Sequence, residues 1–212
     1  MTAIERLSLG PIGTNCYVVR AATDAVDVVV VDPSGGGDEL GPELARRGIR
    51  CGAILVTHGH FDHVFGVADL AEATGAEVTM PEGERFLLER AAELTPPGIT
   101  VRPWPVGIGL TGGETIERCG VTFEVIAVPG HSPAHVAYVL DGVLLSGDVL
   151  FKGSVGRTDL PGGDWPTLLA SIELLVERFP GETQVLPGHG EPTTLAAELA
   201  TNPFLGPLRD RR

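Results

Sequence analysis

The chain has 212 residues, of which 43% are hydrophobic and 20% are charged, and this ordinary composition predicts one globular domain over residues 1–212. Its formal net charge of −13 repels phosphate backbones and anionic lipids, which excludes nucleic acid and membrane surfaces as expected partners. The sequence has no apolar run of the roughly 20 residues that span a bilayer, no signal-peptide pattern and only three scattered cysteines, so we expect a cytoplasmic protein.

The first half of the chain alternates short strands with short helices. Strand patterns are rich in β-branched residues, and helix patterns place apolar residues three and four positions apart. In chain order they predict a strand over 16–20, a strand over 26–31, a short helix from Leu40 to the stop signal Gly48, a strand over 49–56, a helix over 64–75 and a helix over 82–94. The third strand leads directly into the histidine-rich loop Thr57-His58-Gly59-His60-Phe61-Asp62-His63.

The second half begins with strands and ends with a long helix and one more strand. The first of these strands cover 114–117, 121–128, 136–140 and 143–145. Asp141-Gly142, between the last two, is typical of a type I′ hairpin turn. A helix is predicted over 165–179 with Asp164 as its N-cap, and a strand over 184–186 delivers Pro187-Gly188-His189-Gly190. This order predicts an α/β fold in which two sheets carry helices on their outer faces.

The sequence holds six histidines, and every one lies in a loop at the end of a predicted strand. A lone histidine is more often structural than catalytic. Three histidines and an aspartate within residues 58–63 are different, because a dry core would have to supply a hydrogen-bond partner for each ring. Neutral imidazoles and carboxylates are natural ligands of zinc, iron and manganese, so this loop predicts a metal cluster.

The spacing within the loop indicates two neighbouring ions. His58 and His60 can converge on one ion from an extended loop, while Asp62 and His63 leave the loop as a helix begins and can point to a second ion. Three further segments are candidates for completing the two sites: Gly130-His131-Ser132-Pro133, Ser146-Gly147-Asp148 and Gly188-His189-Gly190. A glycine beside each ligand lets the backbone bend sharply and approach the site closely.

In Thr57 to His63, His131, Asp148 and His189 the chain resembles the metallo-β-lactamase superfamily. The resemblance implies an αβ/βα four-layer sandwich with the metals at one edge, between the two sheets. It also implies two sets of ligands and one bridging residue: His58, His60 and His131 for one metal, Asp62, His63 and His189 for the other, and Asp148 between them.

Within the superfamily the chain is similar to the short glyoxalase II-like enzymes. The segments that carry this similarity are Asn15-Cys16-Tyr17, 130–136, 151–159 and 202–205. The similarity implies hydrolysis of a 2-hydroxyacyl thioester, a small-molecule substrate, by a hydroxide held on two divalent metal ions, with zinc expected and iron or manganese as alternatives. Asp62 and Asp148 are the predicted catalytic residues. Lys152 and Arg157 are the predicted contacts to an anionic substrate.

The chain also departs from these relatives. Two-domain glyoxalase II enzymes bind glutathione partly through a C-terminal helical domain, which we do not expect in this chain. They also place a lysine and a tyrosine where Arg157 and Asp159 stand here, and these departures leave the thiol carrier open. A class B β-lactamase has a cysteine in its second metal site, whereas the bridging position here is Asp148, which disfavours β-lactam hydrolysis.

Other activities fit part of the pattern. A persulfide dioxygenase shares the fold and the run Gly156-Arg157-Thr158-Asp159, but uses one iron held by two histidines and an aspartate. The run from Leu186 to Gly190 favours the hydrolase, while a lactonase, another ester hydrolase and a non-catalytic metal-binding relative stay open.

His135 is expected either to orient a ligand or to be structural, and Asp32 is expected to cap a turn near the site. The oligomeric state is not set by the sequence.

Overall fold

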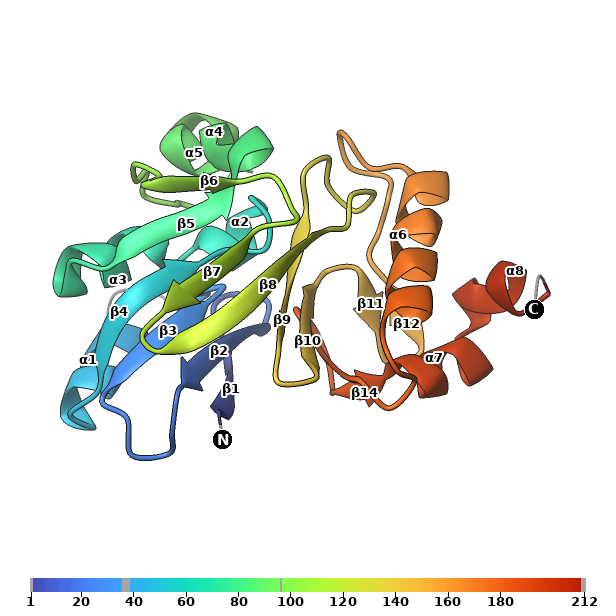
Figure 1. Ribbon diagram of the computed structural model, residues 1–212. Coiled ribbons are helices and arrows are strands. Elements are labelled where there is room, and N and C mark those ends of the chain that lie inside the picture. The colour runs from blue at the N-terminus through green and yellow to red at the C-terminus, as the bar shows by residue number, and fades with distance from the viewer. Residues whose placement is uncertain (1, 36–38, 96, 211–212) are drawn as a thin grey trace.

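The structure, a computed structural model, describes residues 2–35, 39–95 and 97–210. Within these residues the strands form two six-stranded sheets and one small hairpin (Figure 1). No helix in the same residues is long and apolar enough to cross a membrane.

The first sheet is mixed, and its strands follow one another in chain order. They are β1 (Ala3–Leu9), β2 (Thr14–Arg20), β3 (Asp27–Val31), β4 (Arg50–Leu55), β5 (Glu77–Pro81) and β6 (Ile108–Leu110). β1 to β3 pair antiparallel, whereas β3 to β6 pair parallel. Because β3 and β4 are parallel, their carboxyl ends lie at the same edge of the sheet.

Short helices connect the parallel strands and cover the outer face of this sheet (Figure 1). They are α1 (Leu40–Arg46), α2 (Phe61–Val64), α3 (Val67–Thr74), the 3-10 turn η1 (Glu82–Glu84), α4 (Arg85–Glu89) and α5 (Ala91–Leu94). Val18, Val28 and Val30 face this layer and share one apolar core with Leu44 and Leu70.

The second sheet has the strand order β14-β13-β10-β9-β8-β7. Its strands are β7 (Thr115–Arg118), β8 (Val121–Ala127), β9 (Val136–Leu140), β10 (Val143–Gly147), β13 (Gln184–Pro187) and β14 (Thr193–Thr194), and β11 (Leu150–Phe151) pairs with β12 (Ser154–Val155) as a separate hairpin. β10 and β13 are parallel, so the loops that follow them also leave from one edge.

The second sheet carries its own helices: α6 (Trp165–Arg178), α7 (Leu195–Thr201), the 3-10 turn η2 (Pro203–Leu205) and α8 (Gly206–Arg209). Ala137, Leu144 and Val185 pack against Leu168 and Ile172 of α6. The long helix has the expected N-cap, because the Asp164 carboxylate accepts from the Thr167 N–H at 2.9 Å.

Between the two sheets lies a third apolar core. Val29 and Val31 of the first sheet belong to it with Phe123 and Tyr138 of the second. Alternate valines of β3 therefore point to opposite cores, as the geometry of a strand requires. Helices, sheet, sheet and helices thus form four layers, which confirms the expected fold class (Figure 1).

The predicted helix over 64–75 is wrong in its continuity, because α2 and α3 separate at Gly66. The Gly66 N–H donates to the carbonyl of Pro33 at 2.7 Å, and a Cβ at Gly66 would lie 1.8 Å from the carbonyl oxygen of Gly35. Contact with a distant turn, which the local apolar pattern does not record, therefore interrupts the helix.

The predicted helix over 82–94 is also wrong, because it consists of η1, α4 and α5. The backbone leaves the helical region at Glu84 and Arg90, where ψ is 1° and 26°. The Glu84 carboxylate turns inward to hydrogen-bond two other loops, so a tertiary contact outweighs helix propensity here.

The strands β1, β5, β6, β11, β12 and β14 have no counterpart in the sequence prediction. β6 and β14 are two or three residues long, and β5 carries polar side chains at Glu77 and Thr79. The hairpin between β9 and β10 is as expected, since φ is positive at both Asp141 (46°) and Gly142 (77°).

Candidate metal centre

The structure brings together all the side chains that the sequence predicts as metal ligands. They come from four segments at one edge of the sandwich: His58 and His60 in the loop after β4 and Asp62 and His63 in α2 that follows it, His131 after β8, Asp148 after β10, and His189 after β13. Their ligand atoms form two groups, described below, and a third set that overlaps both and consists of His58, His63 and Asp148. Within each set every ligand atom lies within 4.8 Å of the others.

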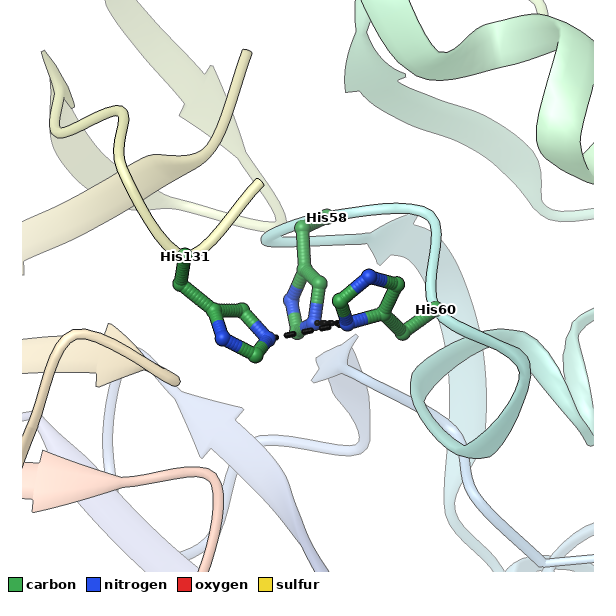
Figure 2. Close-up of side chains that lie close together, drawn as sticks. All are labelled: His58, His60 and His131. Carbon is green, nitrogen blue, oxygen red and sulfur yellow. Dashed lines mark hydrogen bonds between the residues drawn. The ribbon is translucent and has the colours of Figure 1, made fainter. Parts of the chain in front are cut away.

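The first group consists of three imidazoles (Figure 2). His60 Nδ1 lies 3.1 Å from His58 Nε2 and 2.8 Å from His131 Nε2. Figure 2 shows the three rings converging from two separate segments of the chain. His60 therefore presents Nδ1 to this point, whereas the other two rings present Nε2.

The second group consists of Asp62, His63 and His189. Asp62 Oδ2 lies 3.4 Å from His63 Nε2 and 3.2 Å from His189 Nε2. The Thr14 hydroxyl donates to the same carboxylate oxygen at 2.8 Å and so orients Asp62 from β2.

Asp148 lies between the two groups. Its Oδ1 is 3.2 Å from His63 Nε2, while its Oδ2 is 3.5 Å from His131 Nε2 and 3.4 Å from His189 Nε2. One carboxylate therefore faces histidines of both groups, which is the arrangement that a bridging ligand requires.

Hydrogen bonds to residues behind the ligand cluster set which ring nitrogen faces the cluster in His58, His63 and His131. Asp32 Oδ2 lies 2.8 Å from His63 Nδ1 and also accepts from the Thr57 hydroxyl at 2.7 Å. The Thr57 oxygen, whose proton is thus used, lies 3.1 Å from His58 Nδ1. His131 Nδ1 lies 2.8 Å from the carbonyl of Arg157. Each of these Nδ1 atoms can therefore donate outward, which leaves a lone pair on Nε2 pointing into the site.

Asp32 does more than the turn role predicted from the sequence. It is a non-glycine residue with φ +51°, and its other oxygen accepts from the Thr57 N–H at 2.7 Å. The carboxyl end of β3 is thereby tied to the start of the histidine-rich loop. An aspartate directly after a buried strand was the sequence signal for this contact.

His135 is buried beside the predicted ligands without joining them. Its ring stacks on His58, with centroids 4.6 Å apart and planes at 21°, and its Nε2 accepts from the Asp148 N–H at 3.1 Å. Of the two roles left open by the sequence, orientation of a ligand is the one that this contact supports.

Two glycines make room for the cluster. A Cβ at Gly188 would lie 2.1 Å from Asp148 Oδ1 and 2.6 Å from His63 Cε1. Gly147 has φ +50°, and a Cβ there would lie 2.6 Å from the Thr57 hydroxyl oxygen. The close approach expected beside these two ligands is therefore a measurable feature of the backbone.

Glu84 ties two ligand-bearing loops together, and the sequence reasoning missed it. The side chain is buried, its Oε2 accepts from the Gly59 N–H at 2.7 Å, and its Oε1 accepts from the Ser132 hydroxyl at 2.6 Å and the Ala134 N–H at 2.8 Å. Nothing local distinguishes this residue from the other glutamates of its helical stretch.

The loop that carries His189 is held by the segment Asn15-Cys16-Tyr17. The Asn15 amide donates to the carbonyls of Pro187 and Gly190 at 2.8 and 2.9 Å, and the Tyr17 hydroxyl donates to Pro187 at 2.7 Å. These bonds anchor the loop that carries His189 to β2.

Electrostatics differ between the two groups of ligands. Burial lowers the pKa of His58 well below its usual value, and burial together with the neighbouring His131 lowers the pKa of His60 to about 4. These imidazoles are therefore neutral at physiological pH, the form that binds metals.

The second group, with the neighbouring Asp148, pairs buried carboxylates with buried imidazoles. Burial opposes charge on His63, yet the carboxylates of Asp148 and Asp32 hold its pKa well above the usual value. Burial also opposes charge on Asp148, but His63 and His189 hold its pKa well below the usual value. Burial likewise opposes charge on Asp62, but its contact with His189 lowers the Asp62 pKa to about 2. Burial opposes charge on His189 too, but its contacts with Asp148 and Asp62 raise the His189 pKa to about 9. The carboxylates therefore attract protons or metal cations to the same nitrogens.

The donor set fits divalent metal ions. Within the described chain, His63 Nε2 and Asp148 Oδ1 are buried without hydrogen-bond partners and face each other. Such atoms are costly to leave unsatisfied. One cation bound between them would satisfy both, and a second would satisfy the three lone pairs of His58, His60 and His131.

The predicted ligands open onto a pocket of about 790 Å³, within the range of small-molecule sites. His60, Asp62, His131, Asp148 and His189 line it together with residues from α4, α5 and the segment 151–161.

The two predicted substrate contacts have different positions. Arg157 lines the pocket, but its guanidinium is exposed and already paired with both oxygens of Asp159 at 2.7 Å. Lys152 is exposed in the turn between β11 and β12 and does not line the pocket. Both assignments stay predictions.

Comparison with known proteins agrees with this geometry. A family model described as the metallo-beta-lactamase superfamily matches residues 9–189, a span that contains every predicted ligand. The probable metallo-hydrolase YqgX of Bacillus subtilis is 34% identical over 206 residues, which is 95% of this chain and 96% of that protein. Hydroxyacylglutathione hydrolase GloC of Haemophilus influenzae is 32% identical over 209 residues, or 95% of this chain and 97% of that protein.

Solved structures are similar over the same length. The crystal structure of the BLEG-1 B3 metallo-beta-lactamase has a TM-score of 0.88 and 38% identity, covering 96% of this chain and 100% of that one. The crystal structure of TTHA1623 in a di-iron-bound form has a TM-score of 0.82 and 40% identity, covering 95% and 100%.

Proposed function

The chain belongs to the metallo-beta-lactamase superfamily and is a metallo-hydrolase, and we propose that its substrate is a small-molecule thioester. The observation that carries the proposal is the position of Asp148, whose two oxygens face histidines of both ligand groups and so favour a two-metal site. GloC, which matches this chain over 97% of its own length, is named hydroxyacylglutathione hydrolase, and because hydroxyacylglutathione is a thioester this name supports the substrate class.

The proposed metals are two divalent ions, with zinc or iron as the candidates. His58, His60 and His131 would hold one, Asp62, His63 and His189 the other, and Asp148 both. The di-iron form of TTHA1623 supports iron as a serious candidate beside zinc. Bound metals supply a water whose pKa falls from 15.7 to about 7 and a positive charge for a carbonyl oxygen.

The chain's own residues supply position and charge. Asp32, through His63 and Thr57, and the Arg157 carbonyl, through His131, fix ring orientation before any substrate arrives. A thiolate is a good leaving group and needs no strong general acid, which suits a site whose acidic groups serve as ligands.

The test begins with the purified protein, whose bound metals are counted per chain by elemental analysis. The metal-loaded protein is then assayed with a 2-hydroxyacyl thioester and, in parallel, for oxygen uptake with a persulfide. Two metals and release of free thiol support the proposal. One iron with oxygen uptake would replace it by a dioxygenase.

A second candidate is β-lactam hydrolysis. The 38% identity over nearly the whole chain to a protein titled a B3 metallo-beta-lactamase favours it, although the sequence analysis disfavoured it on the basis of Asp148. A chromogenic cephalosporin in the same assay decides between the two. Turnover of the β-lactam with no thioester cleavage would favour this candidate.

A further inference from the structure

Apolar side chains from three separate parts of the chain form the walls of the pocket beside the predicted metal ligands. Ile12 comes from the loop between β1 and β2, Phe86 from α4, Leu94 from α5, and Phe151 and Leu160 from the segment after Asp148. The reacting end of a substrate would therefore meet the metal ligands while the rest of it contacts hydrocarbon.

Three of these side chains are unusually exposed. Ile12 is 56% exposed, Phe86 47% and Leu94 44%. Single exposed apolar residues are common, but these three border the same pocket as His60 and Asp148. Their exposure is explained if an apolar substrate group covers them during binding.

The pocket is poor in free positive charge. Among its described lining residues Arg157 is the only lysine or arginine, and Asp159 already binds its guanidinium through two hydrogen bonds. Peptide carboxylates or phosphates on a thiol carrier would lose hydration there without a free cationic partner.

We infer that the part of the substrate that does not react is apolar and uncharged, and that Ile12, Phe86 and Leu94 determine this specificity. The inference rests on the proposed thioester hydrolysis and names its substrate class. The apolar group belongs to the acyl chain or to the thiol, and separate substrate series distinguish the two.

The first measurement uses the metal-loaded protein and acyl thioesters of N-acetylcysteamine with two to eight acyl carbons. We expect kcat/KM to rise roughly 2- to 4-fold for each added methylene until the pocket is filled, since full burial of one methylene corresponds to about a 4-fold change in affinity. A second series keeps the acyl group and varies an alkyl thiol. A third compares glutathione with N-acetylcysteamine, and glutathione is expected to give no advantage.

The second measurement does not depend on turnover. Thioether analogues of the same chain lengths, which cannot be hydrolysed, are titrated by calorimetry, and we expect affinity to increase with chain length. If no thioester is cleaved while this gradient is present, the proposed function is wrong and the apolar pocket stands. If thioesters are cleaved without any gradient, or if glutathione thioesters are strongly preferred, the inference is wrong and the proposed function stands.

A matched pair of variants tests which side chains cause the dependence of kcat/KM and affinity on chain length, called the gradient here. Leu94→Asn is expected to flatten it, whereas Leu174→Asn, at a leucine of similar exposure (43%) on α6, is expected to leave it unchanged. Light scattering on both variants tests the alternative that the apolar patch joins two copies of the chain. A change of oligomeric state in Leu94→Asn with an intact gradient would overturn the inference.

Discussion

Asp32 Oδ2 lies 2.8 Å from His63 Nδ1, so a residue at the end of β3 fixes a histidine ring that lies 31 positions further along the chain. The same carboxylate holds Thr57, whose hydroxyl oxygen lies beside His58 Nδ1. One buried carboxylate thereby orients predicted ligands of both groups, although Asp32 is not itself a predicted metal ligand.

We therefore predict that Asp32→Asn lowers metal affinity by roughly 10- to 100-fold, the usual cost of losing a partner that orients a metal ligand. Asparagine tolerates the positive φ, so the backbone is preserved. Affinity is measured by competition with a chelator of known strength. Asp141→Asn, at another aspartate with positive φ but in the distant hairpin turn, is the control and should bind metal normally. Equal affinities in the two variants would remove Asp32 from this role.

Glu84→Ala tests the link between the two ligand-bearing loops. The change leaves the buried N–H groups of Gly59 and Ala134 without an acceptor, and we expect it to lower the free energy of unfolding by about 3 kcal/mol. Urea denaturation of the metal-free protein measures this loss apart from metal binding. Glu89→Ala, at a surface glutamate of the following helix α4, should change stability little, because its ion pair with Arg85 lies at the protein surface.

Glu84→Gln gives a finer test of the same contact. Its amide oxygen can accept from one loop, but its amide nitrogen then faces a donor of the other. We expect partial recovery of stability and a persistent loss of metal affinity. Full recovery of both quantities would show that the charge and double acceptance of Glu84 are unnecessary.

The sequence predicted the layers, and it pointed to the side chains that the structure brings together, because both leave local signals. Strand alternation and helical spacing recur over short stretches, and histidines between glycines at strand ends are rare enough to notice. Glu84 and the break at Gly66 left no such signal, since both depend on distant loops: Glu84 contacts loops 25 to 50 residues away, and Gly66 contacts Pro33, which lies 33 residues away. The pairing of Arg157 with Asp159 was also missed, because the sequence suggested that Arg157 was available to substrate.

Gly188→Ala tests the tight space beside Asp148. A methyl group there would collide with Asp148 Oδ1 and His63 Cε1, so both side chains must move away from the predicted metal positions. We expect loss of the second metal with the fold retained, seen as reduced metal content and an unchanged far-ultraviolet circular dichroism spectrum. Gly41→Ala is the control, because no atom lies within 4 Å of its added methyl group. Normal metal content in Gly188→Ala would mean that the loop relaxes freely.

Asp148→Ala tests the position that carries the proposed function. Removal of the carboxylate that faces both groups should abolish turnover and lower the occupancy of both metals. Elemental analysis after gel filtration measures occupancy, and Asp24→Ala, at an exposed turn residue, serves as the control. Loss of only one metal would indicate two independent sites, and full activity would remove Asp148 from the site.

Asp159→Ala tests what keeps Arg157 from a substrate. The Asp159 pKa is lowered to about 2 by its hydrogen bonds with Arg157, so the carboxylate stays ionised and occupies the guanidinium at neutral pH. Its removal frees Arg157 at the rim of the pocket, and we expect kcat/KM for glutathione thioesters, relative to uncharged ones, to rise roughly 2- to 5-fold, as for an exposed ion pair. The gain should fade at high salt, because exposed charges are screened. The double variant Arg157→Ala, Asp159→Ala is the control and should show no increase in the preference for glutathione thioesters. An increase in the double variant would mean that Asp159 repels the substrate directly and that Arg157 is not responsible.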